Sequence, residues 1–198
     1  MDSREQIRGR IIEAAAKRLQ HYGYGKTCMA EIAADCDMSP GNLYRYFANK
    51  LDICECLIRR GVEERLEKLR QIVRQPGLGA AERLEEYFYR EMVETYRKFE
   101  KFPTLLEQTT RAIMSHRPLL MNEFLAASRA LIAEILAMGN ASGEFAVEDV
   151  VVSAEMMQAA TMKFRYPQLH SGADIADLER EVRGVARMLI RGLRHKAA

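Results

Sequence analysis

The stretch from residue 39 to residue 47 carries side chains that could bind a nucleic acid. Leu43 and Phe47 stand four residues apart, as on one face of a helix, and would be buried. The side chains left for the opposite face are small, polar or aromatic with a hydroxyl, namely Ser39, Gly41, Asn42, Tyr44, Arg45 and Tyr46. Such a face can enter a major groove about 12 Å wide and donate hydrogen bonds to bases or phosphates. A helix that only meets solvent would carry more Glu and Lys.

A short helix preceding this stretch is expected to help position it. The pattern predicts this helix over Met29–Cys36. Thr27 is expected to be its N-cap, because a threonine hydroxyl can accept a hydrogen bond from a first-turn amide. Glu31 falls in the first turn, where a carboxylate favours the positive end of the helix dipole.

A second short helix, about Pro40–Phe47, should follow a break at Asp37-Met38. Ser39 can cap it, and Pro40 suits the first helical position because its missing amide proton costs nothing there. Both short helices need an apolar support, and a first helix over about Ser3–His21 can supply it. The residues expected to bury against that helix are Ile32, Ala33, Met38, Leu43 and Phe47.

The rest of the chain also has helical periodicity, so an all-α fold of about nine helices is predicted. No segment alternates apolar and polar residues for long enough to predict a strand. The further helices are expected at about Lys50–Arg74 with Asn49 as its cap, Ala80–Lys101, Leu105–Ser115, Leu119–Met138, Val147–Arg165 stopped at Tyr166-Pro167, and Asp174–Arg194, with a loop at Gly139–Gly143.

Composition limits the class of protein. The chain has 198 residues, of which 48% are hydrophobic, enough for one large domain or for a small and a larger one. Its formal net charge is only +2, so any basic face must be local. No run of about 18 apolar residues predicts a membrane span, and the first residues lack an apolar signal core, so a cytoplasmic protein is expected.

The motif as a whole resembles the TetR/AcrR family of repressors over roughly Arg8–Ile58. The resemblance is carried by a first amphipathic helix ending in Tyr22-Gly23-Tyr24, by Thr27, by Ile32-Ala33, and by the run from Ser39 to Lys50. It implies a three-helix, helix-turn-helix DNA-binding domain at 1–50, with the motif at about 31–50. It also implies a helical ligand-binding and dimerisation domain at 51–198, joined to the first by the long fourth helix.

The resemblance further implies the partners, which are double-stranded operator DNA, a small apolar or amphipathic effector, and a second copy of the chain in a homodimer. Thr27 and Lys50 would contact phosphates, and Gly41 and Asn42 would lie where bases are read. Tyr44 and Tyr46 would contact the backbone or thymine methyl groups. The whole expected DNA-binding set is Lys26, Thr27, Ser39, Gly41, Asn42, Tyr44, Arg45, Tyr46 and Lys50.

The resemblance also implies an effector pocket among the fourth to eighth helices, and aromatic residues and flexible methionines gather in this part of the sequence. The candidate lining is Phe88, Met92, Tyr96, Leu106, Thr109, Met121, Phe124, Met157 and Thr161. The alternative is that these apolar stripes are ordinary core. A DNA-binding protein without any ligand would also need no such pocket.

The last two helices are the expected dimer surface, because both carry apolar residues at three- and four-residue steps. The candidate residues are Val151, Glu155, Met162, Leu178, Val182, Val185, Leu189 and Leu193. The alternative is that these helices are merely central to one subunit.

Enzymatic and metal chemistry find little support in the sequence. It has no nucleophile elbow, no phosphate-binding glycine loop and no HExxH motif, so no enzyme activity and no cofactor are expected. Cys54 and Cys56 form a CxC on a helix, whose side chains point too far apart to share one ion. Structural thiols are favoured over a sensor for these and for Cys28 and Cys36.

Overall fold

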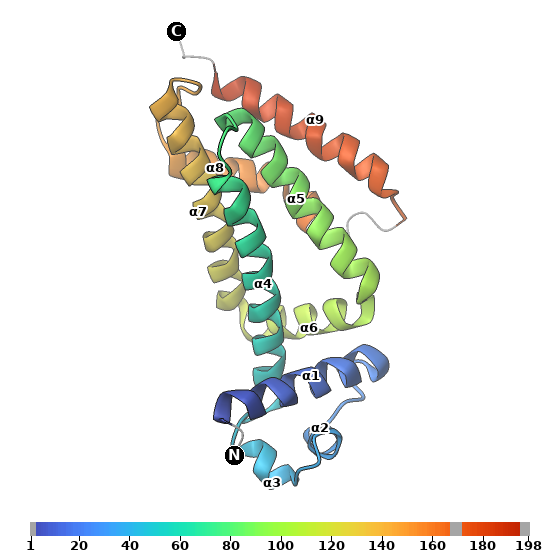
Figure 1. The fold of residues 1–198 in the computed structure, drawn as a ribbon. Helices are drawn as coiled ribbons and strands as arrows, with labels where there is room; N and C mark the ends of the chain where they lie inside the picture. Colours follow the sequence, from blue (N-terminus) through green and yellow to red (C-terminus); the bar gives the residue numbers. More distant parts are fainter. Residues whose placement is uncertain (1–2, 167–171, 195–198) are drawn as a thin grey trace. The chain divides into compact units, whose positions relative to one another are not determined.

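The computed structural model describes residues 3–166 and 172–194 of the chain (Figure 1). Within these ranges it consists of helices and connecting loops, without a strand, which confirms the all-α prediction. The α-helices are α1 (Arg4–Tyr22), α2 (Met29–Asp35), α3 (Pro40–Tyr44), α4 (Lys50–Arg74), α5 (Ala80–Lys101), α6 (Pro103–His116), α7 (Pro118–Ser142), α8 (Val150–Ala160) and α9 (Ile175–Leu193), and a 3₁₀ turn, η1, spans Met162–Arg165.

The main departure from the predicted elements concerns the eighth helix, which begins three residues later than expected. Asp149 is its N-cap, and its carboxylate accepts hydrogen bonds from the amides of Val151 (2.9 Å) and Val152 (3.0 Å). The α-helix ends at Ala160 and gives way to η1, whereas one continuous helix had been predicted. The expected stop at Pro167 lies outside the described residues.

Two compact units make up the fold. The first unit comprises Met1–Glu63 and Lys101–Asn122, and the second comprises Glu64–Glu100 and Glu123–Ala198. The helices α4 and α7 each contribute residues to both units. The sequence-based division at residue 50 falls at the start of α4, whereas the first unit extends 13 residues further and also takes in α6.

The core of the first unit is apolar and is built on α1, as predicted. Ile32, Ala33, Leu43 and Phe47 are buried there, and Met38 packs against them at the edge. Asp37 adopts a positive φ of 55° in the turn between α2 and α3, a conformation that short polar side chains tolerate better than bulky ones. The amide of Met38 closes this turn by donating to the carbonyl of Ala33 (3.0 Å).

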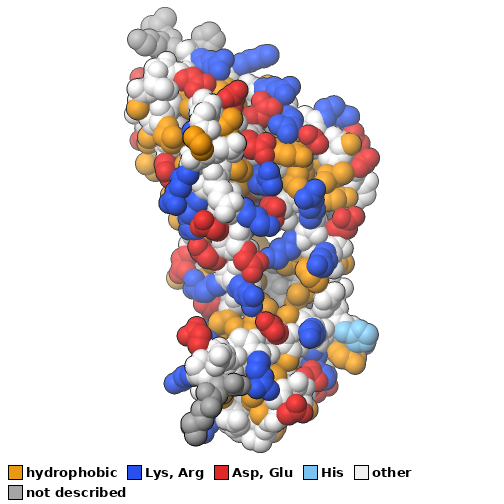
Figure 2. Space-filling model, in the orientation of Figure 1, with side chains coloured by type: hydrophobic (Ala, Val, Ile, Leu, Met, Phe, Trp, Pro, Cys, Tyr) orange, Lys and Arg blue, Asp and Glu red, His pale blue; other side chains and the backbone are white. Residues whose placement is uncertain are grey.

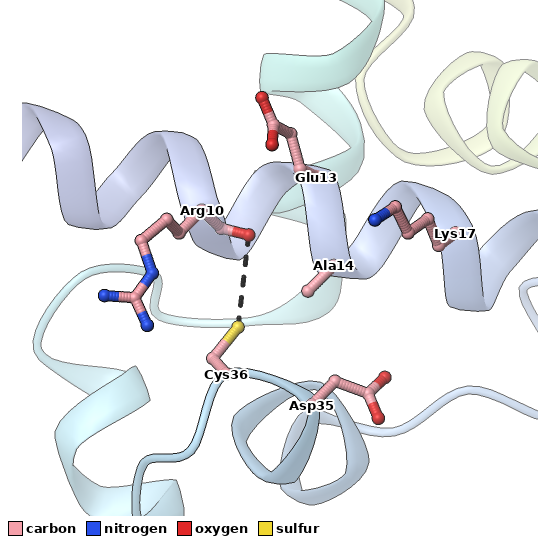
Figure 3. Close-up of a pocket in the computed structure, with 6 residues that line it drawn as sticks. All are labelled: Arg10, Glu13, Ala14, Lys17, Asp35 and Cys36. Atoms are coloured by element: carbon pink, nitrogen blue, oxygen red, sulfur yellow. Dashed lines mark hydrogen bonds between the residues drawn. The ribbon is translucent and has the colours of Figure 1, made fainter.

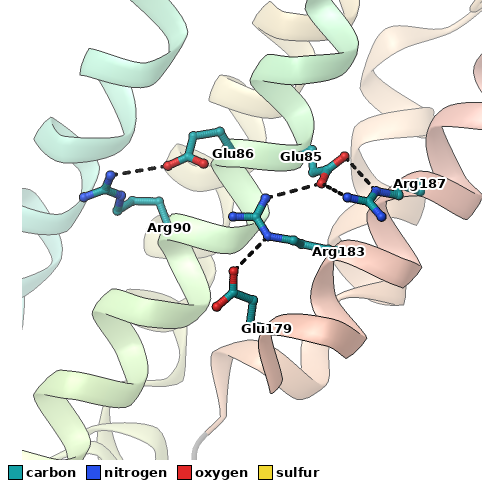
Figure 4. Close-up of polar contacts among 6 residues, drawn as sticks. All are labelled: Glu85, Glu86, Arg90, Glu179, Arg183 and Arg187. Carbon is teal, nitrogen blue, oxygen red and sulfur yellow. Dashed lines mark hydrogen bonds and ion pairs between the residues drawn. The ribbon is translucent and has the colours of Figure 1, made fainter. Parts of the chain in front are cut away.

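In the second unit, α9 is fastened to α5 by charged side chains (Figure 4). The carboxylate of Glu85 accepts hydrogen bonds from Arg187 (2.9 and 3.1 Å) and from Arg183 (3.3 Å). The guanidinium of Arg183 also lies over the ring of Tyr89, 4.0 Å from its centroid. Apolar contacts complete the attachment, because Leu178, Val182, Ala186 and Ile190 of α9 are buried.

A close approach near the end of α7 requires glycine. A Cβ atom at Gly139 would lie 2.0 Å from the ring of Phe145, so any other residue would displace that buried ring. The loop predicted at 139–143 is instead helical up to Ser142, and the chain turns only at Gly143, where φ is 76°.

The visible surface shows basic and acidic side chains interspersed (Figure 2), in keeping with the small net charge of +2. Within the ranges given above, no helix has both the length and the apolar character needed to cross a membrane.

Candidate functional site

The helix α3 presents a polar face to solvent, as the sequence predicts. Ser39 accepts a hydrogen bond from the amide of Asn42 (3.3 Å), and Pro40 occupies the first turn. Leu43 is fully buried, and it anchors the helix on its other side. The predicted contact residues on the solvent side are Ser39, Gly41, Tyr44 and Arg45, which are exposed, and Asn42 and Tyr46, which are half-buried. Six residues therefore form a short polar surface that the buried side chain of Leu43 anchors to the core.

Two arginines of α1 hold the far end of α3. Arg8 donates to the carbonyl of Tyr46 (2.5 Å), and its guanidinium lies 4.1 Å from the ring centroid of Phe47. Arg4 reaches the carbonyl of Arg45 at 3.5 Å. These contacts satisfy carbonyl groups that a helix end leaves without intrahelical partners. The first helix therefore supports the exposed face through polar bonds as well as through its apolar stripe.

The helix α2 is fixed to α1 by a bidentate ion pair that the sequence analysis missed. Arg18 donates to both oxygens of Asp35 (2.5 and 2.7 Å) and lies 3.4 Å from Glu31. The hydrogen bond from Arg18 is the main cause that lowers the pKa of Asp35. The two residues are 17 positions apart, so no helical spacing could have revealed the pair.

The N-cap predicted for α2 is wrong by one residue. Cys28 is the cap residue, and its amide donates to Glu31 (2.8 Å), a bond that lowers the pKa of the Glu31 carboxyl. Thr27 is only 2% exposed, and its hydroxyl donates to the carbonyl of Gly23 (2.8 Å). The side chain of Thr27 therefore closes the loop between α1 and α2 and has little surface with which to contact a phosphate.

Lys50 also has partners within the protein. Its ammonium donates to the carbonyls of Tyr24 and Thr27, the latter at 2.6 Å, and it lies 4.0 Å from the ring centroid of Tyr24. It thus ties the loop before α2 to the start of α4, where the Asn49 side chain accepts from the amide of Asp52 (3.0 Å), as expected of a cap. Lys26, in the same loop, is exposed.

A surface cavity of about 410 Å³ lies between α1 and α2 (Figure 3). Its lining combines two cations with two carboxylates, so it favours neither sign of ligand charge; the lining residues are Arg10, Glu13, Ala14, Lys17, Asp35 and Cys36. The Cys36 thiol there is nearly buried, and burial raises its pKa. Cys54 is fully buried, which raises its pKa to about 12 and keeps it a thiol at neutral pH.

The residues predicted to line an effector pocket divide between the two units. Leu106, Thr109 and Met121 belong to the first. The other six belong to the second, where Phe88, Met92, Phe124, Met157 and Thr161 are buried and Tyr96 is half-buried. A cavity of the second unit lies elsewhere, in the connection between α7 and α8, and its lining includes Asn140, Glu144, Phe145 and Arg194.

A buried polar cluster in the second unit escaped the sequence analysis. Tyr87 and Glu91 of α5, Ser128 of α7 and Arg165 of η1 all contribute to it. Arg165 lies 2.8 Å from Glu91, and the Ser128 hydroxyl donates to Glu91 (3.1 Å) and contacts the Tyr87 hydroxyl (2.8 Å). Burial is the main cause that raises the pKa of Tyr87. The four-residue step from Tyr87 to Glu91 on an otherwise apolar helix face was the available signal.

The predicted dimer residues fall into three groups by burial. Leu178 and Val182 are fully buried within their own unit, so we leave them out of the interface. Val151, Glu155 and Met162 are exposed, and the remaining three, Val185, Leu189 and Leu193, are half-buried. Three further apolar side chains are exposed on the same two helices, namely Val152, Met156 and Met188, the last at 73%.

Comparison with known proteins agrees with this architecture. Residues 11–57 match the family described as "Bacterial regulatory proteins, tetR family", and residues 80–186 match "Tetracyclin repressor-like, C-terminal domain". A search of curated proteins gives no match.

Among solved structures, a TetR/AcrR-family transcriptional regulator from Thermobifida fusca YX-ER1 is similar, with a TM-score of 0.71, 21% identity, and coverage of 95% of this chain and 98% of that one. A transcriptional regulator from Cytophaga hutchinsonii ATCC 33406 has a TM-score of 0.69 and 25% identity, with coverage of 93% of this chain and 97% of that one. A protein described as a TetR-family regulator from Mesorhizobium loti MAFF303099 has a TM-score of 0.75 and 16% identity, with coverage of 97% of this chain and 98% of that one. Because its N-terminal and C-terminal parts both match descriptions of this family, the chain belongs to the TetR family of bacterial transcriptional regulators.

Proposed function

We propose that the protein is a ligand-responsive repressor, which binds operator DNA as a homodimer and is released by a small apolar or amphipathic molecule. It would act in the cytoplasm, where the operator is. The observation that carries the DNA-binding half is the face of α3, where Tyr44 and Arg45 are exposed while Leu43 anchors the helix. Side chains of these types can donate to phosphates and base edges in a major groove.

The geometry changes which residues are proposed to meet DNA directly. Ser39, Gly41, Asn42, Tyr44, Arg45, Tyr46 and Lys26 keep the proposed contact role, because their side chains or backbone reach solvent. Lys50 and Thr27 take an indirect one, because the ammonium and the hydroxyl are both bonded to carbonyl groups of the loop before α2. They would shape this loop so that its backbone amides and Lys26 can approach a phosphate.

Dimerisation is proposed through α8 and α9. Val151, Val152, Met156 and Met188 leave apolar side chains exposed on these helices, a pattern typical of a surface that another protein covers. Gly184 and Gly192 of α9 have open space where a Cβ would stand, which permits close approach of a second helix. Two subunits would then place their α3 helices in successive major grooves, about 34–36 Å apart.

Release would follow from a ligand that prefers a conformation unable to match both half-sites. The helix α4 has residues in both units, so a shift of its second part can be passed to the DNA-binding unit. A ligand with equal affinity for both conformations would shift nothing, and a coupling of about 1–3 kcal/mol would be normal.

The decisive experiment is an operator titration. A duplex enriched by in vitro selection on the protein would be titrated by fluorescence anisotropy, and the stoichiometry would be read from the saturation point. We expect two chains per duplex and an affinity that falls steeply with salt. Sequence-independent binding, or one chain per duplex, would contradict the proposal.

Two rival functions make different predictions. An enzyme would turn over a bound compound. A DNA-binding protein without a ligand would be stabilised by none of the compounds in a thermal-shift screen.

A further inference from the structure

The helix α3, with five residues, is too short to hold its own orientation. Isolated helices shorter than about 12–15 residues are marginal in water, so the placing of α3 depends on contacts with the rest of its unit. Leu43 is the buried residue of the helix. The chain then leaves the helix through a turn at Arg45 and Tyr46, before the buried Phe47. The orientation of the side chains at 44–46 therefore depends on what holds this turn.

One guanidinium, that of Arg8 on α1, contacts three separate groups at this turn and beyond it. Its Nη1 atom donates to the carbonyl of Tyr46 at 2.5 Å. Its Nη2 atom donates to the Sγ atom of Cys56, on α4, at 3.5 Å. Its central carbon lies over the ring of Phe47, 4.1 Å from the centroid. A planar group with a fixed fork of donors can make all three contacts at once, whereas the ammonium of a lysine is a single point of charge.

The part of α4 that Arg8 contacts is itself fastened. Arg117, between α6 and α7, donates to the carboxylates of Asp52 and Glu55 in the first two turns of α4. Glu55 immediately precedes Cys56 in the chain. Arg8 therefore joins the end of α3 to a segment of α4 that another pair of helices holds in place.

The contacts of Arg8 serve the placing of α3 more than its charge. The Arg8 side chain is half-buried, whereas Arg4, one turn earlier on α1, is exposed. A hydrogen bond from a charged donor is roughly twice as strong as one between neutral groups, so the Tyr46 carbonyl is firmly held. Phosphate contacts carry no sequence information, whereas base contacts require an exactly placed helix. Loss of Arg8 should therefore weaken sequence recognition and leave general attraction to DNA intact.

We infer that Arg8 is a positioning residue for operator recognition, which fixes the end of α3 against α4 so that Tyr44, Arg45 and Tyr46 meet the groove in register. The inference rests on the operator binding proposed above and adds the residue through which α4 acts on the reading helix. A displacement of the first turns of α4 would move Cys56 and, through Arg8, the carbonyl of Tyr46. The alternative is that Arg8 contacts a DNA phosphate directly, and the two roles predict different measurements.

The first test is Arg8→Lys, which keeps the positive charge and removes the planar group. Fluorescence anisotropy would measure its affinity for the selected operator and for a scrambled duplex of the same length. We expect operator affinity to fall at least about fivefold, the lower end of what one base contact contributes, and affinity for the scrambled duplex to stay unchanged. Equal losses on both duplexes, or no loss on either, would overturn the inference.

The variant Arg8→Gln addresses the phosphate alternative, because it removes the charge. A lost phosphate contact would reduce the slope of log affinity against log salt by about 0.9 on either duplex. A positioning residue should leave the slope on the scrambled duplex unchanged while the preference for the operator falls. A reduced slope there would assign Arg8 to a phosphate and refute the positioning role.

The link to α4 is tested with Cys56→Ala, which removes the sulfur acceptor and keeps a good helix former in place. We expect a smaller loss of operator preference than for Arg8→Lys, and no further loss when the two are combined, because both break the same link. Additive losses, or no loss for Cys56→Ala, would refute the role of α4. If Arg8→Lys does not fold, as judged by circular dichroism, Cys56→Ala decides alone, and an unchanged operator preference would refute the inference.

The matched control is Arg10→Lys, because Arg10 is an exposed arginine of the same helix that lines the cavity between α1 and α2. It should change neither affinity. The inference and the proposed function can fail separately. An unaltered protein that binds both duplexes equally contradicts operator recognition and, with it, the role of Arg8. An unaltered protein with a strong preference, which Arg8→Lys retains, keeps the proposed function and refutes the positioning role alone.

Discussion

The two units satisfy their buried polar groups in different ways. In the first, the hydroxyls of the buried residues Thr27 and Thr109 each donate to a carbonyl four positions earlier in the chain. The second repeats this local bond at Thr161, whose hydroxyl donates to the carbonyl of Met157, but it adds long-range contacts. Tyr87 and Ser128 meet across 41 positions, and Glu91 faces Arg165 from another helix. The core of the first unit thus supports α3 mainly by apolar packing and by local hydrogen bonds. The second contains charged groups whose burial is costly unless they are well paired, and such groups gather at functional sites.

The largest expected effect would come from breaking the buried pair. Glu91→Ala should lower the free energy of unfolding by about 3–5 kcal/mol, because it leaves the Arg165 charge uncompensated in the interior. Urea unfolding would measure it. The double variant Glu91→Met with Arg165→Met should recover most of the loss, since an apolar pair of similar volume is often no less stable. A double variant as unstable as the single one would show that the loss is not electrostatic.

Next in size is the effect of a charge on the proposed dimer surface. Met188→Glu should raise the dimer dissociation constant by at least about a hundredfold, because an unpaired carboxylate would be buried in the interface. Its fold should survive, since Met188 is 73% exposed within the subunit. Sedimentation velocity would report the change. Leu119→Glu, at a 74% exposed leucine of the first unit, is the control and should leave the dimer intact.

The reading face of α3 can be tested with two tyrosines of nearly equal exposure. Tyr44→Ala should weaken operator binding by about 1–3 kcal/mol, the usual contribution of one groove contact, with little change in stability. Tyr22→Ala should leave operator affinity unchanged, because Tyr22 stands at the end of α1. The Tyr44 side chain is 53% exposed and the Tyr22 side chain is 51% exposed. Equal losses for both variants in an anisotropy titration would argue against α3 as the reading helix.

The two lysines near α2 should behave differently. Lys26→Ala should reduce the slope of log affinity against log salt by about 0.9, as expected for one lost phosphate contact, and leave stability unchanged. Lys50→Ala should instead destabilise the protein by about 1–3 kcal/mol, because the carbonyls of Tyr24 and Thr27 lose a charged donor. A thermal melt together with a salt series would distinguish the two roles. A reduced salt slope for Lys50→Ala at unchanged stability would restore its direct phosphate contact.

The smallest expected effect concerns the exposed pair of Arg18 and Asp35. Asp35→Asn should cost no more than about 1 kcal/mol at pH 7, because exposed pairs are screened by water. The pKa of Asp35 is lowered from 3.8 in the folded protein, so the pair stabilises fully above that value and its contribution is lost as pH falls through the lower, folded pKa. Urea midpoints of the variant and the parent should therefore differ at pH 7 and converge as the pH falls below 3.8. A difference that persists there would point to a role beyond charge.

Local patterns in the sequence were enough to predict the helical fold and the face of α3. Capping residues and four-residue spacings operate within a few positions, so Ser39, Pro40, Leu43 and Phe47 could be interpreted without a structure. The start of α8 was missed because Asp149 was not recognised as a cap.

Only the tertiary structure decided which polar groups find partners far along the chain. Lys50 had the sequence environment of a phosphate ligand, yet its ammonium reaches carbonyls 23 and 26 positions away. Leu178 has the helical spacing of an interface residue but is buried in its own unit. Arg165 meets Glu91 only because η1 ends beside α5. Periodicity shows that a helix has an apolar face, but what that face packs against depends on contacts between distant segments, which no local pattern encodes.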